Sequence, residues 1–252
     1  MFARRALVSA LVPIMLFSAC TSSSESQSQT ILEVYAASSL ATPFAEAGVA
    51  FERAHPGVKV QFNLGASSDL ARFVQEGAPA DVFASADVAN IDKVESQDLL
   101  DSASVIFATN YLEIIVEKGN PLNISSLEDL SNPDLIFITT NPDVPIGKYT
   151  AEVLRKAGVS ITPDSFESNV KGIMLKVASG EADAGIVYHS EVIASDGQVE
   201  GIKIPTEFNI VAEYPVGIIK NSANKKPAQD FIDFLLSPKG QALLTQYGFK
   251  TP

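Results

Sequence analysis

The feature of this sequence that most constrains its fold is a regular alternation, from residue 31 onward, of short apolar runs and amphipathic stretches of helical period. Apolar runs of five to seven residues predict buried strands, and apolar residues spaced three and four positions apart predict helices. Such alternation is typical of α/β folds, in which helices cover both faces of mostly parallel sheets. The predicted strands span 31–36, 58–62, 80–85, 111–117, 135–140, 184–188 and 214–219, and the main helices span 40–51, 67–76, 89–99, 147–158, 169–179, 227–236 and 238–247.

The length of the chain allows two lobes. About 220 residues follow Thr30, which is enough for one large domain or for two α/β lobes of about 100 residues each. We expect two lobes, with the C-terminal helices returning to the first, and we expect the chain to cross between them at Asn110 and near Tyr214. Lobe I would then comprise residues 31–109 and 218–252, and lobe II residues 110–217.

The first 19 residues are typical of an export signal. Arg4 and Arg5 precede an apolar run over 6–17 that is shorter than the roughly 20 residues a membrane-spanning helix needs. The run ends in Leu16-Phe-Ser-Ala-Cys20, which resembles a lipoprotein cleavage site except that Phe17 stands where Leu is usual. Residues 1–19 are therefore predicted to be a lipoprotein signal peptide, and Cys20 the lipidated residue. The alternative is an ordinary secretory signal cleaved near Ala19.

The residues after the signal predict a tethered extracytoplasmic protein. Cys20 is the only cysteine, so the chain can form no internal disulfide. Residues 20–30 are rich in Ser, Gln and Thr and predict a flexible tether, which would hold the globular part at the outer face of the cell membrane. Cleavage before Cys20 removes two arginines and no acid, so the net charge of −12 becomes −14. That charge argues against nucleic-acid binding and against long-range attraction of anions.

Small residues and hydroxyls gather where predicted strands end and predicted helices begin. The carboxyl ends of parallel strands are where α/β folds bind ligands, and a helix N-terminus offers unpaired N–H groups to an anion without any Lys or Arg. Each serine is also explained by helix capping alone. The junctions are 38–39, 66–68, 145–147 and 168–170.

Several strings of residues together resemble the molybdate-binding proteins of ABC importers. The resemblance extends over residues 31–252, with the strings in the order found in that family. The strings are Ala36-Ala-Ser-Ser-Leu40, Gly77-Ala-Pro-Ala-Asp-Val-Phe-Ala-Ser-Ala-Asp87, Val144-Pro-Ile-Gly-Lys-Tyr149, Gly185-Ile-Val-Tyr188, Glu213-Tyr-Pro-Val216 and Tyr247-Gly-Phe249.

The resemblance implies a two-lobed, type II periplasmic binding protein-like clamp that closes over a tetrahedral oxyanion. By matching residue to residue, Ser39 and Ser67 would each supply a hydroxyl and a backbone N–H, Ile146 and Val170 backbone N–H groups, and Tyr188 its phenolic O–H. The bound species would be molybdate or tungstate, with molybdenum held as the oxyanion, no side chain ligating metal directly and no cofactor. The chain departs from the family at Ile146, where Ala is common, and at His189, where a smaller residue is common.

The same resemblance implies the partners. A monomer of this kind would deliver its anion to the permease of an ABC importer and would catalyse no reaction.

Two alternatives remain open. The protein could bind sulfate or ferric iron, since relatives of those classes share parts of the motif that includes Asp81 and Asp87. We expect Asp81 to support its own loop and Asp87 to cap the next helix. A secreted hydrolase is the second alternative, because Ser168 and Lys171 fit a Ser-x-x-Lys pattern. No Lys-Thr-Gly follows that pattern, and neither His55 nor His189 has an evident nucleophile partner.

Overall fold

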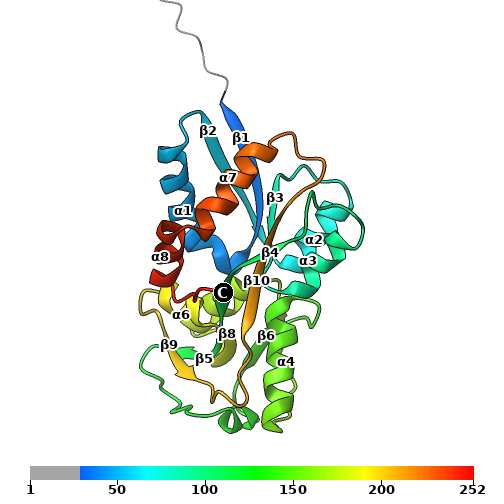
Figure 1. Ribbon diagram of the computed structural model, residues 1–252. Coiled ribbons are helices and arrows are strands. Elements are labelled where there is room, and N and C mark those ends of the chain that lie inside the picture. Colours follow the sequence, from blue (N-terminus) through cyan, green and yellow to red (C-terminus); the bar gives the residue numbers. More distant parts are fainter. Residues whose placement is uncertain (1–28) are drawn as a thin grey trace, which may run out of the picture.

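A computed structural model describes residues 29–252, which form two five-stranded sheets with helices packed on them (Figure 1). The predicted signal peptide, Cys20 and most of the predicted tether lie outside the described residues. Thr30, which we expected to end the tether, is instead the first residue of β1. No helix in the described part of the chain is long and apolar enough to cross a membrane.

The first sheet combines strands from both ends of the described chain. Strand β1 runs parallel to β2 and β3, and β10 runs antiparallel to β3 and β4. The order is β2 (Val58–Gly65), β1 (Thr30–Ala37), β3 (Val82–Ala84), β10 (Ala212–Ile218) and β4 (Val105–Asn110). The helices that accompany it are η1 (Ser38–Leu40), α1 (Ala41–Ala54), α2 (Ser67–Gln75), α3 (Val88–Glu95), α7 (Lys225–Leu236) and α8 (Pro238–Gln246).

The second sheet is built from the middle of the chain. Strand β6 runs parallel to β7 and β8, whereas β5 runs antiparallel to β8 and β9. The order is β7 (Ser165–Glu167), β6 (Phe137–Thr140), β8 (Ala184–Tyr188), β5 (Leu112–Glu117) and β9 (Val199–Lys203). Its helices are η2 (Glu128–Ser131), α4 (Pro145–Ala157), α5 (Val170–Ala178) and α6 (His189–Ala194).

The α/β class is confirmed, but the sheets are mixed instead of mostly parallel. Strands β1, β2, β3, β6, β7 and β8 all end toward the boundary between the two sheets, which is where the pocket described below lies. Strands β5 and β10 each enter their sheet from the other lobe, so they start at that boundary and run away from it. Crossing between lobes therefore produces the antiparallel pairings.

The chain leaves the first sheet where we expected and returns earlier than we expected. It passes from β4 to β5 at Asn110, and it returns between Lys203 and Ala212. Residues 212–217, which we assigned to lobe II, pair with β3 and β4 in the first sheet. Tyr214 thus lies inside a strand of the first lobe and does not mark a crossover.

The core of the first lobe forms on the apolar face of α1. The predicted inward residues Leu40, Phe44, Ala47 and Phe51 are all at most 1% exposed. Phe44 and Phe51 both make edge-to-face contacts with Phe231 of α7, at centroid distances of 5.8 and 5.3 Å. Each such buried ring contributes roughly 1.5–3 kcal/mol, so α1 and α7 together fix one side of the lobe.

Gly147 allows α4 to begin directly against the end of β6. A Cβ at this position would lie 2.4 Å from the carbonyl oxygen of Thr140 and 2.3 Å from that of Asn141. Any larger residue would push the helix away from the strand. The glycine thereby fixes the place of the first turn of α4, where Ile146 lies.

Candidate anion-binding site

A small pocket lies between the two lobes, where several strands end and helices begin. All five residues that the sequence singled out line it: Ser39 and Ser67 from the first lobe, and Ile146, Val170 and Tyr188 from the second. Each of the five is at most 3% exposed. The two lobes therefore meet around the pocket and shield it from solvent.

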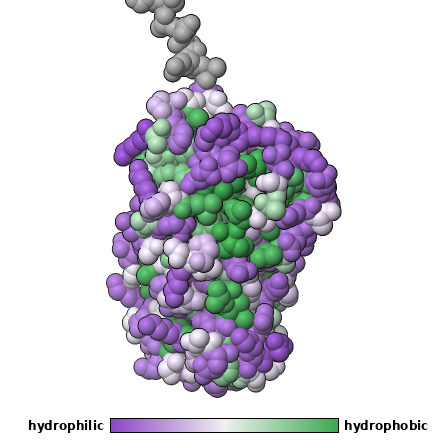
Figure 2. All heavy atoms as spheres, viewed as in Figure 1, coloured by the Kyte–Doolittle hydropathy of each residue, from purple (hydrophilic) through white to green (hydrophobic). Residues whose placement is uncertain are grey.

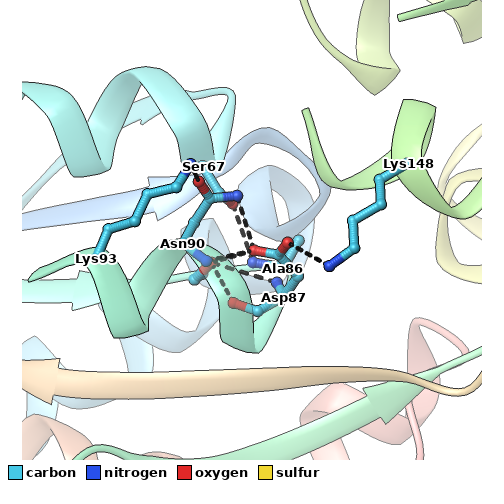
Figure 3. Close-up of polar contacts among 7 residues, drawn as sticks. Ser67, Ala86, Asp87, Asn90, Lys93 and Lys148 are labelled. Carbon is cyan, nitrogen blue, oxygen red and sulfur yellow. Dashed lines mark hydrogen bonds and ion pairs between the residues drawn. The ribbon is translucent and has the colours of Figure 1, made fainter. Parts of the chain in front are cut away.

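The two serines of the first lobe each have a polar partner. The backbone N–H of Ala86 donates to Ser67 Oγ at 3.0 Å, and Ser39 Oγ lies 3.0 Å from the hydroxyl of Tyr214 (Figure 3 for Ser67 and Ala86). We expected Ser67 to cap α2, but Ala66 is the N-cap and no side chain makes a capping bond there. With Ala86 donating to its oxygen, the Ser67 hydroxyl keeps its own proton available to a ligand.

The two apolar residues of the second lobe lie in first helical turns. Ile146 is in the first turn of α4, whose N-cap makes no side-chain bond. Val170 is the first residue of α5, and Asn169 Oδ1 accepts from the N–H groups of Lys171 and Gly172 at 3.0 and 3.3 Å. The first N–H groups of a helix have no partner within it. The capping by Asn169 thus leaves the N–H of Val170 available to a ligand.

Tyr188 places a phenol in the pocket at the end of β8. Its hydroxyl is buried and has no hydrogen-bond partner among the described residues. The ring packs edge-on against Tyr214 and Tyr149, at centroid distances of 5.6 and 6.4 Å. Burial raises the pKa of Tyr188 well above its ordinary value, so the hydroxyl stays protonated at neutral pH. A buried hydroxyl without a partner is costly, and an anion in the pocket would satisfy it.

The residues that line the pocket carry no charged side chain. They offer hydroxyl protons and backbone N–H groups, together with the partial positive charge at the N-termini of α2, α4 and α5. Such a lining suits a small anion that accepts hydrogen bonds in every direction. The described lining contains no pair of a nucleophile and a base.

Sequence reasoning did not identify the residues that support this lining. Tyr214 is fully buried in β10 and holds Ser39, and Asn169 both caps α5 and lines the pocket. Asn169 had a signal, since Asn before a helical stretch is a common N-cap. The contact of Tyr214 with Ser39 could not be predicted from local sequence, because the two residues are 175 positions apart in the chain.

Asp81 and Asp87, which belong to the motif shared with sulfate- and iron-binding relatives, both accept hydrogen bonds within the first lobe. Asp81 accepts hydrogen bonds from the N–H of Glu33, the hydroxyl of Ser222 and the amide of Asn224. Asp87 caps α3, as expected. The described residues contain no group of three or more His, Cys, Asp and Glu side chains arranged to hold a metal ion.

Lys171 and the two histidines, which were considered for a hydrolase, also contact other side chains. Lys171 Nζ lies 2.8 Å from Glu191 of α6. His55 stacks on Phe51 at 4.0 Å, and His189 Nδ1 lies 3.1 Å from Glu113.

Comparison with known proteins relates nearly all of the described residues to solute-binding proteins. Residues 32–250 match the family described as bacterial extracellular solute-binding protein. The chain is 36% identical over 219 residues to the molybdate-binding protein ModA of Mycobacterium tuberculosis, covering 87% of this chain and 84% of that one. It is 29% identical over 251 residues to YvgL of Bacillus subtilis, described as a putative ABC transporter substrate-binding lipoprotein, covering 96% of each chain.

A solved structure shares the fold. The sulfate-binding protein SubI of Mycobacterium tuberculosis superposes with a TM-score of 0.81 at 22% identity, over 88% of this chain and 87% of that one. At that identity the likeness speaks for the two-lobed α/β fold alone.

Proposed function

Because the chain belongs to the bacterial extracellular solute-binding protein family, we propose that it captures molybdate, and also tungstate, between its lobes and delivers the anion to an ABC importer. The observation that carries the proposal is the unpartnered, buried hydroxyl of Tyr188 in a small pocket that the starts of α4 and α5 also line. The 36% identity to a molybdate-binding protein supports the choice of anion.

Capture in this proposal is a closing of the two lobes around the anion. Ser39 and Ser67 would bind from the first lobe, and the N–H groups of Ile146 and Val170 with the hydroxyl of Tyr188 would bind from the second. Neither half can satisfy the anion alone, so the ligand stabilises the closed arrangement over an open one. Opening of the lobes at the importer would release the anion, and no bond is made or broken.

The hydrogen-bonding character of the lining supports a fully deprotonated anion. The pocket offers hydroxyl and N–H donors, and the side-chain acceptor of Asn169 is already used by Lys171 and Gly172. Molybdate, tungstate and sulfate carry no proton at neutral pH, whereas phosphate keeps at least one, which would need an acceptor in the pocket. Exclusion of phosphate would therefore come from hydrogen bonding, and exclusion of sulfate from the size of the closed cavity.

We propose further that the protein is a lipoprotein held at the outer face of the cell membrane through Cys20. The relative from Bacillus subtilis, itself described as a putative lipoprotein, aligns over nearly the whole chain and supports this placement. Replacing Cys20 by Ser should move the protein from the membrane fraction to the soluble fraction of cells. A single acyl chain binds membranes only marginally, so more than one chain on Cys20 would be needed. Unchanged membrane association of the variant would refute lipidation.

A panel of ligands in a thermal-shift assay tests the function. Molybdate and tungstate should each raise the melting temperature, because a ligand at 100 times its dissociation constant adds about 2.7 kcal/mol to the stability of the folded state. Sulfate, phosphate and ferric iron should have much smaller effects. A shift with sulfate or iron and none with molybdate would establish the corresponding alternative instead.

A further inference from the structure

We propose that Lys148 and Asp87 form an ionic contact between the two lobes that holds the clamp closed and slows release of the anion; this rests on the proposed clamp function. Lys148 belongs to α4 in the second lobe, and Asp87 is the N-cap of α3 in the first. The ammonium nitrogen of Lys148 lies 3.9 Å from Asp87 Oδ2, across the boundary between the lobes (Figure 3).

The carboxylate of Asp87 is fixed before Lys148 reaches it. Its Oδ1 accepts from the backbone N–H of Asn90 at 3.1 Å and from the side-chain amide of Asn90 at 2.8 Å. The hydroxyl of Ser85 lies 3.3 Å from the same oxygen. Only 2% of the Asp87 side chain is exposed, so it presents Oδ2 in one direction, toward the second lobe.

Lys148, in contrast, is the solvent-exposed partner of the contact. Its side chain is 49% exposed, and its ammonium lies 5.9 Å from the centre of the Tyr149 ring on the same helix. If the lobes separate, this ammonium can return to water at little cost, whereas Asp87 keeps its bonds to Asn90. The contact therefore depends on closure and contributes nothing to either lobe alone.

Both partners are joined directly to groups of the pocket. Asp87 follows Ala86, whose N–H donates to Ser67 Oγ, and Lys148 is two residues after Ile146 in the first turn of α4. The ion pair consequently forms in the same arrangement that brings Ser67 and Ile146 to the anion. The ion pair also places the positive charge of Lys148 beside the buried carboxylate of Asp87, which directly follows Ala86 of the pocket lining. This positive charge offsets the repulsion between the carboxylate and a bound dianion.

Lys93 provides a matched control within the same network. Its ammonium donates to Asn90 Oδ1 at 2.8 Å, so it contacts the residue that fixes Asp87 (Figure 3). Lys93 lies on α3, however, and its contact stays inside the first lobe. Removing its charge alters the same hydrogen-bond network, but it removes no contact between lobes.

Release of labelled molybdate from preloaded protein, chased with excess unlabelled molybdate, measures the effect. Lys148→Gln should release the anion about three- to tenfold faster, with an association rate within twofold of the parent, because the contact forms after encounter. Lys93→Gln should release the anion at the parental rate. Lys148→Arg, which keeps the positive charge, should also release it about as slowly as the parent. Raising the salt concentration should accelerate release from the parent and leave Lys148→Gln nearly unchanged. Equal release rates in the parent and Lys148→Gln, or equal acceleration by Lys93→Gln, would overturn the proposal.

A measurement without ligand separates this proposal from the function itself. Spin labels on Gln61→Cys and Lys118→Cys, two exposed positions in different lobes, report the distance between the lobes in a Cys20→Ser background. Lys148→Gln should shift the ligand-free protein toward longer distances, and Lys93→Gln should not. Failure of the parent to bind molybdate would refute the proposed anion, whereas identical distance distributions in all three proteins would refute the ionic contact.

Discussion

In the proposed site, single residues act as neutral donors, and neighbouring residues outside the anion's contacts fix the orientation of the two serines. Ala86 donates to the oxygen of Ser67, and Tyr214 lies in hydrogen-bond contact with the oxygen of Ser39. Tyr188 differs from the serines because nothing among the described residues bonds its hydroxyl. Removing this free hydroxyl should therefore weaken ligand binding more directly than removing either serine hydroxyl.

Replacing Tyr188 by Phe should weaken molybdate binding by about 10- to 100-fold. A hydrogen bond to a charged acceptor is worth about 1.5–3 kcal/mol, and the substitution removes one hydroxyl without changing the ring. Titration calorimetry measures the change. Tyr149→Phe is the matched control, since Tyr149 packs against Tyr188 but does not line the pocket, and it should bind as the parent does. An unchanged dissociation constant for Tyr188→Phe would remove this residue from the site.

The buried phenol of Tyr214 should make stability depend on alkaline pH. Burial raises its pKa well above the ordinary value of 10, so above pH 10 the unfolded chain loses this proton while the folded protein keeps it. The free energy of unfolding should therefore fall as the pH rises above 10, by at most about 1.4 kcal/mol per pH unit for one group. Urea unfolding at pH 8 to 11 should show a shallower decline in Tyr214→Phe. Equal slopes in the two proteins would contradict the assignment.

Among the elements, the starts of α4 and α5 are the proposed ligand-binding parts of the second lobe. The side chains of Ile146 and Val170 have nothing to offer an anion, so residue type alone would never select them. Their place in first helical turns, together with the resemblance to a known family, made them candidates. Whether their N–H groups bind a ligand is a prediction that two substitutions at one position can test.

Val170→Pro should abolish the backbone donor, and Val170→Ala should keep it. Proline is tolerated in the first turn of a helix, and Asn169 already has the extended conformation that proline requires of its predecessor (φ −161°, ψ 174°). We expect the proline variant to fold and to bind molybdate at least tenfold more weakly. The alanine variant should bind normally but lose about 1–3 kcal/mol of stability, because the valine is 3% exposed.

Circular dichroism and titration calorimetry of both variants decide between donor and packing roles. A folded proline variant that binds as tightly as the parent would show that the N–H of Val170 is not a ligand donor.

The sequence predicted elements well where a single face is apolar and poorly where it is not. The spacing of Phe44, Ala47 and Phe51 located α1, and all three are buried. Strands β7 and β9 were missed because they are short and mostly not buried, and β9 contains Gly201. Strand β4 and helix α6 were also missed, and α6 follows β8 without a turn. Strand direction could not be predicted, because it depends on the lobe from which the chain arrives.

As a whole molecule, the chain is closed around its pocket. Its surface in Figure 2 is largely hydrophilic, with apolar side chains gathered near the middle of the first lobe. The buried apolar core continues from Leu32 in the first lobe to Tyr188 in the second, so the lobes share one packed interior. Because the chain is acidic, with a net charge of −12, it does not attract anions from a distance, and in the proposed function the local donors must provide the affinity.

The whole-molecule layout was only partly predictable. Two lobes and the first crossing at Asn110 followed from the pattern of strands, and the structure has both. The return was placed wrongly because the strand predicted over 214–219 was expected to begin at the crossing, whereas β10 begins at Ala212 and accommodates Pro215 with a register shift against β4. The point at which the chain returns to the first lobe depends on which distant strands pair with β10, and local sequence does not reveal that pairing.

A crystal structure of the protein with molybdate tests the central claim most directly. We predict one molybdate per chain in the pocket between the lobes, with its oxygens about 2.7–3.1 Å from the N–H groups of Ile146 and Val170 and from the hydroxyls of Ser39, Ser67 and Tyr188. No Lys or Arg side chain should contact the anion. An anion bound elsewhere, an anion held by cationic side chains, or an empty pocket at saturating molybdate would contradict the account.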